Sequence, residues 1–254
     1  MRYLNLILLI LLCPILAMGQ KLPKLQTGAL RAPATVKVDG NVAEWGQLQA
    51  YNNATEVYYT MANNDECLYL VIQATENLVV RKIMAGGITL TINPGMKNKI
   101  TVLYPVIDTK DQPNIGLRLA PELIKKPGKA DSIMTASNKQ LELRAKEIKI
   151  KGVADLDSLQ SVYNINGIKA AGRFDNKLTY TYELAIPLKY LGMSLATETK
   201  FNYNVMLNGS DHAEGTIVEN IEGGVRARGS TPVKDMMFFW SSTDLSGWYT
   251  LAKN

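Results

Sequence analysis

The sequence predicts an all-β fold, a single antiparallel β-sandwich, from three observations. Short runs in which polar and apolar residues alternate recur along the chain, and this period of two is typical of strands with one buried face. Residues that favour turns separate these runs, and no long stretch has the period of a helix. The 254 residues of the chain also suit one large sandwich with a full core, because such domains reach ~200–250 residues.

Residues 1–19 have the pattern of a cleaved signal peptide. A basic residue, Arg2, precedes the apolar run Leu4–Leu16, and small residues follow up to Gln20. That order is typical of secretory signal peptides, and the run is shorter than the ~20 residues of a membrane-spanning helix. We therefore expect a secreted or periplasmic protein, with one β-sandwich domain over residues 20–254 and no membrane span in the mature chain.

The first half of the mature chain contains five strand patterns. We expect strands at residues 35–38, 57–61, 68–74, 88–92 and 100–106. A short polar or turn-forming segment joins the second pattern to the third and the fourth to the fifth, so each pair predicts a β-hairpin. Asp39-Gly40 supplies a tight turn after the first strand.

Residues 108–139 interrupt this regular pattern. They contain three prolines, and only residues 120–125 have the character of a short helix. Because proline cannot donate a backbone hydrogen bond within a sheet, we expect a long irregular insertion between strands. Alternation resumes over residues 140–151, where one shift of phase indicates a strand with a bulge.

The clearest strand pattern covers residues 178–186, which we expect to form a hairpin with residues 167–173. Four large residues alternate onto the face that we assign to the core: Tyr180, Tyr182, Leu184 and Ile186. The other face carries Thr179, Thr181 and Glu183, which we expect to point away from the core. Solvent and a bound cation are the two alternatives for the Glu183 carboxylate.

Composition and charge exclude several classes of function. The formal charge of +5 comes from scattered basic residues, whereas nucleic-acid binding requires a concentrated basic surface. His212 is the only histidine, so a metal site built from several imidazoles is excluded, and a Ser-His-Asp triad would depend on this residue. Cys13 leaves with the signal peptide, which leaves Cys67 without a partner for an internal disulfide. Paired carboxylates leave a glycosidase open; with the other catalytic constellations mostly absent, we expect that the protein is not an enzyme.

Two stretches of the chain carry a resemblance to a known family. The first combines VDGNVAEW, residues 38–45, with CLYLVI, residues 67–72; the second is YTYELAIPL, residues 180–188. Their order and spacing resemble the carbohydrate-binding modules of family 9 and their wider relatives over nearly the whole mature chain. The resemblance implies a non-catalytic carbohydrate-binding β-sandwich whose partner is a glycan or polysaccharide.

The same resemblance implies where aromatic residues would contact a sugar. In sugar-binding members of the family, two aromatic rings enclose the sugar and polar side chains bind its hydroxyl groups. Trp240 corresponds to the second ring. Where the first ring would lie, this chain has residues 77–82, which include no aromatic side chain. Trp248 and Tyr249 correspond to the closing strand of the family.

A row of asparagines supplies candidate polar partners for the sugar. In residues 201–208, large apolar residues alternate with mostly polar ones. Asn202, Asn204 and Asn208 are therefore predicted to project together from the face opposite the apolar residues. Asparagine has a poor β propensity, and its amide can both donate and accept hydrogen bonds. The row is interpreted either as an ordinary polar surface or as a hydroxyl-binding row beside Trp240.

Asp39 and Glu44 are the candidate metal ligands. Their carboxylates are hard oxygen donors, which calcium prefers, so we expect a structural calcium ion between them. A turn at Asp39 beside a solvated Glu44 explains the two residues equally well.

Two other functions remain open at the level of sequence. One is a haem-binding electron-transfer sandwich, because related folds use Met with Lys or His as axial ligands and the chain has ten methionines. The other is an interaction domain of a cell-surface assembly.

Overall fold

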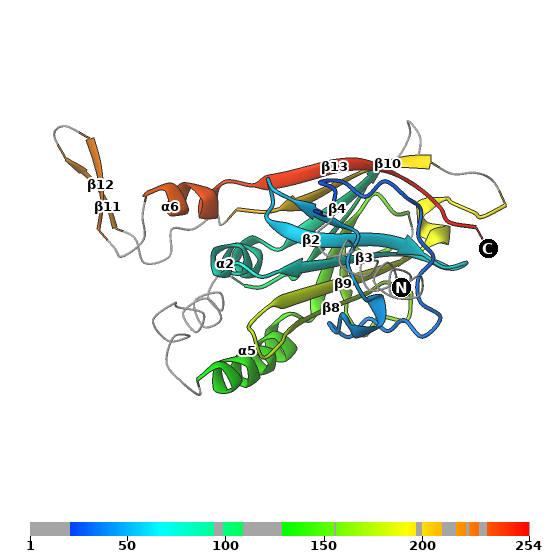
Figure 1. Cartoon of the computed structure of the whole chain (residues 1–254), viewed down its shortest axis with the longest axis horizontal. Coiled ribbons are helices and arrows are strands. Elements are labelled where there is room, and N and C mark those ends of the chain that lie inside the picture. The colour runs from blue at the N-terminus through cyan, green and yellow to red at the C-terminus, as the bar shows by residue number, and fades with distance from the viewer. Residues whose placement is uncertain are drawn as a thin grey trace, which may run out of the picture.

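The computed structural model describes residues 21–93, 99–108, 129–154, 156–196, 200–209 and 237–253, and the backbone of residues 217–221, 224–228 and 233–236. Within them, a five-stranded and a six-stranded antiparallel sheet form the body of the protein (Figure 1). This arrangement confirms the predicted all-β class. Residues 1–19, residues 120–125 and His212 lie outside the described residues.

The five-stranded sheet has the order β1-β2-β3-β9-β8. Its strands are β1 (Ala50–Asn52), β2 (Val57–Asn63), β3 (Cys67–Ala74), β9 (Tyr180–Pro187) and β8 (Lys169–Phe174). The predicted hairpins β2–β3 and β8–β9 are both confirmed. They join where β3 pairs with β9, which places Cys67 opposite Pro187. The two stretches that carry the family resemblance therefore lie side by side.

The six-stranded sheet has the order β13-β10-β4-β5-β6-β7. Its strands are β13 (Thr243–Thr250), β10 (Lys200–Leu207), β4 (Ile88–Asn93), β5 (Ile100–Tyr104), β6 (Glu147–Lys151) and β7 (Leu159–Ser161). The predicted β4–β5 hairpin is confirmed, and Trp248 and Tyr249 lie in the closing strand β13, as predicted. A separate hairpin pairs β11 (Ile217–Ile221) with β12 (Gly224–Arg228).

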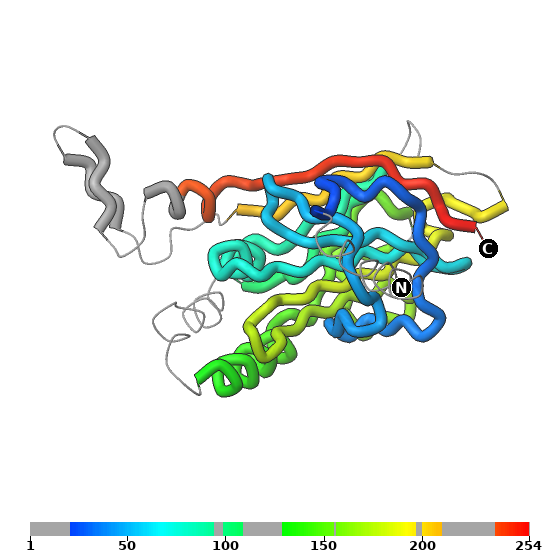
Figure 2. The backbone as a smooth tube through the Cα atoms, viewed as in Figure 1, coloured from blue at the N-terminus to red at the C-terminus, as the bar shows by residue number. Residues whose placement is uncertain are grey.

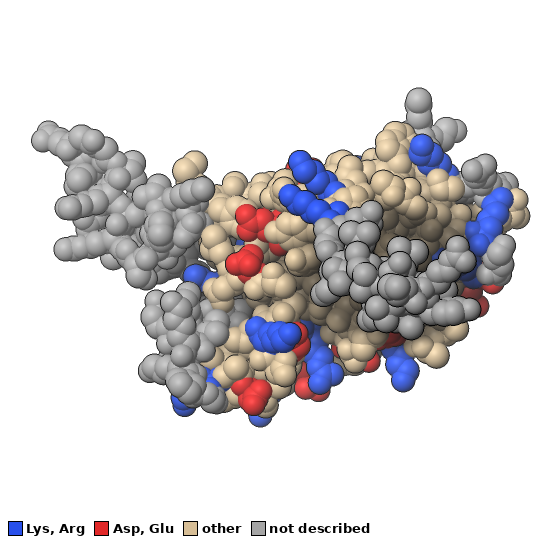
Figure 3. Space-filling view, in the orientation of Figure 1, with Lys and Arg blue, Asp and Glu red and all other residues tan. Residues whose placement is uncertain are grey.

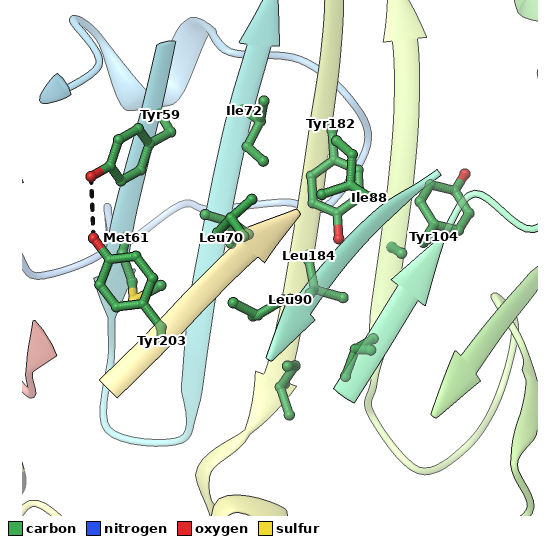
Figure 4. Close-up of a cluster of buried hydrophobic side chains, with 14 of the residues drawn as sticks. Tyr59, Met61, Leu70, Ile72, Ile88, Leu90, Tyr104, Tyr182, Leu184 and Tyr203 are labelled. Atoms are coloured by element: carbon green, nitrogen blue, oxygen red, sulfur yellow. Dashed lines mark hydrogen bonds between the residues drawn. The ribbon is translucent and has the colours of Figure 1, made fainter. Parts of the chain in front are cut away.

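The core lies between the two sheets, with large side chains from both (Figure 4). The Tyr59 hydroxyl of β2 and the Tyr203 hydroxyl of β10 are 3.1 Å apart and share a hydrogen bond. On the other side of the core, the rings of Tyr104 and Tyr182 are 5.9 Å apart. Gly247 of β13 lies opposite Tyr203, and its missing side chain matters because a Cβ there would lie 2.6 Å from the Tyr203 hydroxyl.

A helix replaces part of the predicted irregular insertion. The described helices are α2 (Asn77–Gly86), α5 (Ala130–Arg144), α6 (Val233–Trp240) and the short 3-10 turns η2 (Ala43–Trp45) and η4 (Leu188–Leu191). The prediction of irregular chain at residues 130–139 and of a strand at 140–144 was therefore wrong. Leu141 is buried but Leu143 is 52% exposed, so the two do not share a strand face. Leu141 packs on the core with Ile133 and Met134, and this spacing is that of a helix.

The predicted strand at residues 35–38 is also absent, since these residues form irregular chain. Val36 and Val38 instead pack against a second apolar cluster on the outer face of the five-stranded sheet. The alternation of Val36 and Val38 arises because both side chains contact the outer face of the sheet, although the residues do not form a strand themselves. The N-terminal segment thereby becomes a cover for the sheet.

This cover changes the environment of β9. Tyr180, Tyr182, Leu184 and Ile186 are buried in the main core, as predicted. Thr179, Thr181 and Glu183 occupy the opposite face but are also buried. Their orientation away from the main core is therefore confirmed, and the Glu183 carboxylate binds donors of the N-terminal segment in place of either alternative considered for it, solvent or a cation.

The N-terminal segment also joins the edges of the two sheets. Gln26 donates a hydrogen bond from its side chain to the Met61 carbonyl of β2, and the Leu30 backbone exchanges hydrogen bonds with the Tyr249 hydroxyl of β13. Figure 2 shows this blue segment beside the red closing strand. The beginning and the end of the described chain thus lie together at one edge of the sandwich.

Candidate functional site

Strand β10 shows the predicted alternation of buried and outward-facing residues. Its core side holds Phe201, Tyr203, Val205 and Leu207, all buried. Asn202, Asn204 and Met206 are half-buried between them. The amides therefore lie on the outer face of the six-stranded sheet.

Strand pairing gives these amides polar neighbours on both sides. Asn202 lies between Trp248 of β13 and Asn93 of β4, and Asn204 lies between Ser246 and Thr91. Directly opposed side chains on neighbouring strands have Cβ atoms ~4.5–5.5 Å apart. We call this set the amide face; it consists of Trp248, Ser246, Asn202, Asn204, Asn93 and Thr91.

Trp248 gives the amide face an exposed ring. Its side chain is 59% exposed, which is unusual for a residue with so much apolar area. The ammonium group of Lys200 lies 5.1 Å from the centre of this ring, within the range of a cation–π contact. A flat apolar ring, a cation and several amides therefore lie next to one another.

A groove of about 790 Å³ lies at this end of the amide face. Its wall includes Trp248, Asn202 and Asn93, together with the N-terminal segment Leu25–Ala29. This volume falls in the range of small-ligand sites, ~300–1,000 Å³. The groove is thus large enough for one or more sugar rings.

The two central asparagines differ in their hydrogen bonding. The Asn204 Nδ2 donates to Asp244 Oδ2 at 2.6 Å and to Ser246 Oγ at 2.9 Å, so its amide is held by β13. The Asn202 Oδ1 is shielded from solvent and accepts no hydrogen bond from the described residues. A buried polar atom without a partner is rare in folded proteins. Asn202 Oδ1 is therefore an acceptor without a donor in the described part of the chain, and a ligand hydroxyl group would reach it only if the side chain turned outward.

Trp240 and Asn208 lie at the opposite end of β10. Asn208 follows the strand, six positions beyond Asn202, which corresponds to roughly 20 Å along it. Its Nδ2 donates to the Gly86 carbonyl and to Thr89 Oγ1, at 2.8 and 2.9 Å, so it fixes the end of α2. Trp240, the last residue of α6, has its carbonyl packed against Gly209. The structure thus places Asn208 and Trp240 at one end and Asn202 and Asn204 nearer Trp248.

Helix α6 is anchored to α2 beside Trp240. Lys82 of α2 is fully buried, and its Nζ donates to Thr243 Oγ1 at 3.0 Å and lies 4.3 Å from the centre of the Phe238 ring. Burial lowers the pKa of Lys82 to about 8. Arg81 lies 5.7 Å from the centre of the Phe239 ring. These contacts give Lys82 a packing role at the α2–α6 contact.

The buried carboxylate of Glu183 joins the two stretches that carry the family resemblance. Its Oε2 accepts hydrogen bonds from the backbone N–H groups of Asp39 and Gly40, at 2.9 and 2.6 Å, and its Oε1 accepts one from Trp45 Nε1 at 2.6 Å. Burial raises the pKa of Glu183, although these three hydrogen bonds oppose the change. We call these four residues the Glu183 clasp. It holds the N-terminal cover on the sheet.

The predicted metal ligands, Asp39 and Glu44, both bind backbone groups. Asp39 Oδ1 accepts the N–H of Asn41 at 2.9 Å, and Glu44 Oε1 accepts the N–H of Lys37 at 3.1 Å. Within the described residues, no group of three or more Cys, His, Asp or Glu side chains is arranged to hold an ion. Calcium at this position stays a prediction.

The described surface was also inspected for charged patches and the described helices for membrane-spanning length. On the face seen in Figure 3, basic and acidic residues are interspersed and form no single-sign patch. No helix among the described residues is long and apolar enough to cross a membrane.

Comparison with protein-family models and with curated proteins finds no match for this chain.

Trp248 and Lys200 are the site residues that sequence reasoning did not assign. The signal was present in β13, where Asp244, Ser246 and Trp248 alternate with the buried Leu245 and Tyr249. This alternation would have placed the Trp248 ring outside the core.

Proposed function

We propose that this protein is a non-catalytic carbohydrate-binding β-sandwich that acts outside the cytoplasm and binds a glycan at the amide face. The observation that carries the proposal is the exposed Trp248 ring opposite Asn202, whose Oδ1 has no partner among the described residues. Sugar C–H faces pack on aromatic rings, while amides satisfy sugar hydroxyl groups. The resemblance to family 9 modules and the signal-peptide pattern support the same function.

The proposal assigns the ring to Trp248 instead of Trp240, on the basis of its neighbours. Asn202 lies opposite Trp248 and its Oδ1 has no partner among the described residues, whereas the amide of Asn208 near Trp240 donates two hydrogen bonds to the protein. A ring beside an unsatisfied acceptor is better suited to a polar ligand than a ring beside a satisfied amide.

A glycan array followed by titration calorimetry tests the proposal, with Trp240→Ala as the matched control. Trp248→Ala is expected to weaken binding to the best glycan by about 2 kcal/mol or more, roughly thirtyfold in Kd. Its melting temperature should hardly change, because the ring is mostly exposed. Trp240→Ala should bind normally. Loss of binding in Trp240→Ala alone would place the site at α6, and absence of glycan binding by the native protein would refute the function.

A further inference from the structure

We propose that the groove beside Trp248 selects acidic glycans, in which a sugar carboxylate binds Lys200 while the sugar ring packs on Trp248. This inference rests on the proposed function and adds the chemical class of the ligand. It starts from the charges that line the groove. Of the described residues in its wall, Lys200 is the only charged one, and none of them carries a carboxylate.

The position of the Lys200 ammonium group fits this role. Lys200 lies on the same outer face as Asn202, two positions before it in β10. Its ammonium is 5.1 Å from the centre of the Trp248 ring. A pyranose stacked on this face of the Trp248 ring would displace the ammonium from it, and a carboxylate on that sugar would give the ammonium a new partner beside the ring. A neutral sugar would leave this cation unused.

The nearest acid on the amide-face side of β13 is already engaged elsewhere. Asp244 accepts the 2.6 Å hydrogen bond from Asn204 Nδ2 and lies four residues from Trp248, which is about 13 Å along the strand. Among the described residues, the only ion pair joins Arg31 to Asp65. Within the described chain, the charge of Lys200 is therefore available to an anionic ligand.

The exposure of Lys200 determines how much its replacement should weaken binding. Lys200 is exposed, and ion pairs at exposed sites are weak and screened by salt. Replacing Lys200 by a neutral residue should therefore weaken binding of an acidic oligosaccharide about twofold to fivefold. The contact with the ring and the amides, which neutral sugars also use, should persist.

The experiment compares polygalacturonate oligosaccharides with the same oligosaccharides after methyl esterification, by titration calorimetry at low and high salt. The native protein is expected to prefer the acid form, and the preference should shrink as salt rises. Lys200→Gln should bind both forms equally, Lys200→Arg should keep the preference, and Trp248→Ala should lose both ligands. Alginate and hyaluronan oligosaccharides, each with its esterified form, extend the test to other uronic acids.

Lys189→Gln is the control variant. Lys189 is also exposed and its ammonium also lies close to an aromatic ring, 4.9 Å from the centre of Tyr190, but it does not line the groove. It should leave the preference unchanged. Equal binding of acid and ester by the native protein, or a preference that survives in Lys200→Gln, would overturn the acidic-glycan proposal while leaving carbohydrate binding intact. Failure to bind any glycan would overturn both proposals.

Discussion

The outer face of the five-stranded sheet is covered by the chain itself, whereas the outer face of the six-stranded sheet is open at β10. Each face contains a shielded carbonyl-type oxygen at the centre of a strand. Glu183 on the covered face accepts three hydrogen bonds from the cover, and Asn202 on the open face accepts none from the described residues. Two similar polar oxygens thus differ in whether the described chain itself supplies their donors.

The largest expected effect is on the covered face. Glu183→Ala removes the acceptor for two backbone N–H groups and for the Trp45 indole, and leaves these donors buried without partners. We expect a loss of about 3–5 kcal/mol in the free energy of unfolding, measured by urea denaturation. If the loss is below about 1 kcal/mol, the Glu183 clasp does not hold the cover and the contrast between the two faces fails.

On the open face the corresponding change should affect binding and not stability. Asn202→Ala removes an acceptor without a protein partner, so the free energy of unfolding should stay the same or rise slightly, while glycan affinity falls by about 1–3 kcal/mol. Asn204→Ala is the matched comparison, because it breaks two hydrogen bonds to β13 and should cost about 0.5–1.5 kcal/mol of stability. A variant of Asn202 that binds normally would show that its oxygen is not used.

A smaller effect is the pH dependence of the free energy of unfolding, which arises from Glu183 on the covered face. Because burial raises the pKa of Glu183, the folded protein holds this proton at a higher pH than the unfolded chain does. Stability should therefore decrease as pH rises from the ordinary glutamate pKa through the raised value. Glu183→Gln, which cannot titrate, should lack this decrease. Parallel urea curves for the two proteins over that pH range measure it, and identical slopes would contradict the shift.

The smallest expected effect comes from metal removal at Asp39 and Glu44. Each carboxylate already accepts a backbone N–H, so a calcium ion bound there would need further ligands. A structural ion would raise the melting temperature by mass action, and a chelator would remove that increase. A melting curve that is the same with and without chelator would end the calcium prediction.

Local patterns predicted the strands better than they predicted the surroundings of each strand. The alternation in β9 and β10 assigned the faces correctly, because a period of two is a property of the strand alone. Glu183 was assigned to the correct face, but the donors that bind its carboxylate could not be foreseen, because they lie some 140 positions earlier in the chain. Leu141 and Leu143 imitated a strand within α5, and only tertiary packing distinguishes the buried one from the exposed one.

The candidate site was predicted only where a pattern within one strand determines it. Asn202 and Asn204 follow from the alternation of β10, but which tryptophan accompanies them depends on how β13 pairs with that strand. The register places Trp248 opposite Asn202, and no local signal in the sequence fixes a register between strands more than forty residues apart.

The pairing of the two ends of the described chain has a consequence for folding. The Leu30 N–H donates to the Tyr249 hydroxyl, and Asn63 Oδ1 accepts the N–H of Ala252, so these contacts join residues 219 and 189 positions apart. Pairing between residues so distant in sequence is slow to form. This edge of the sandwich is therefore expected to close after the local hairpins β2–β3 and β8–β9 have formed.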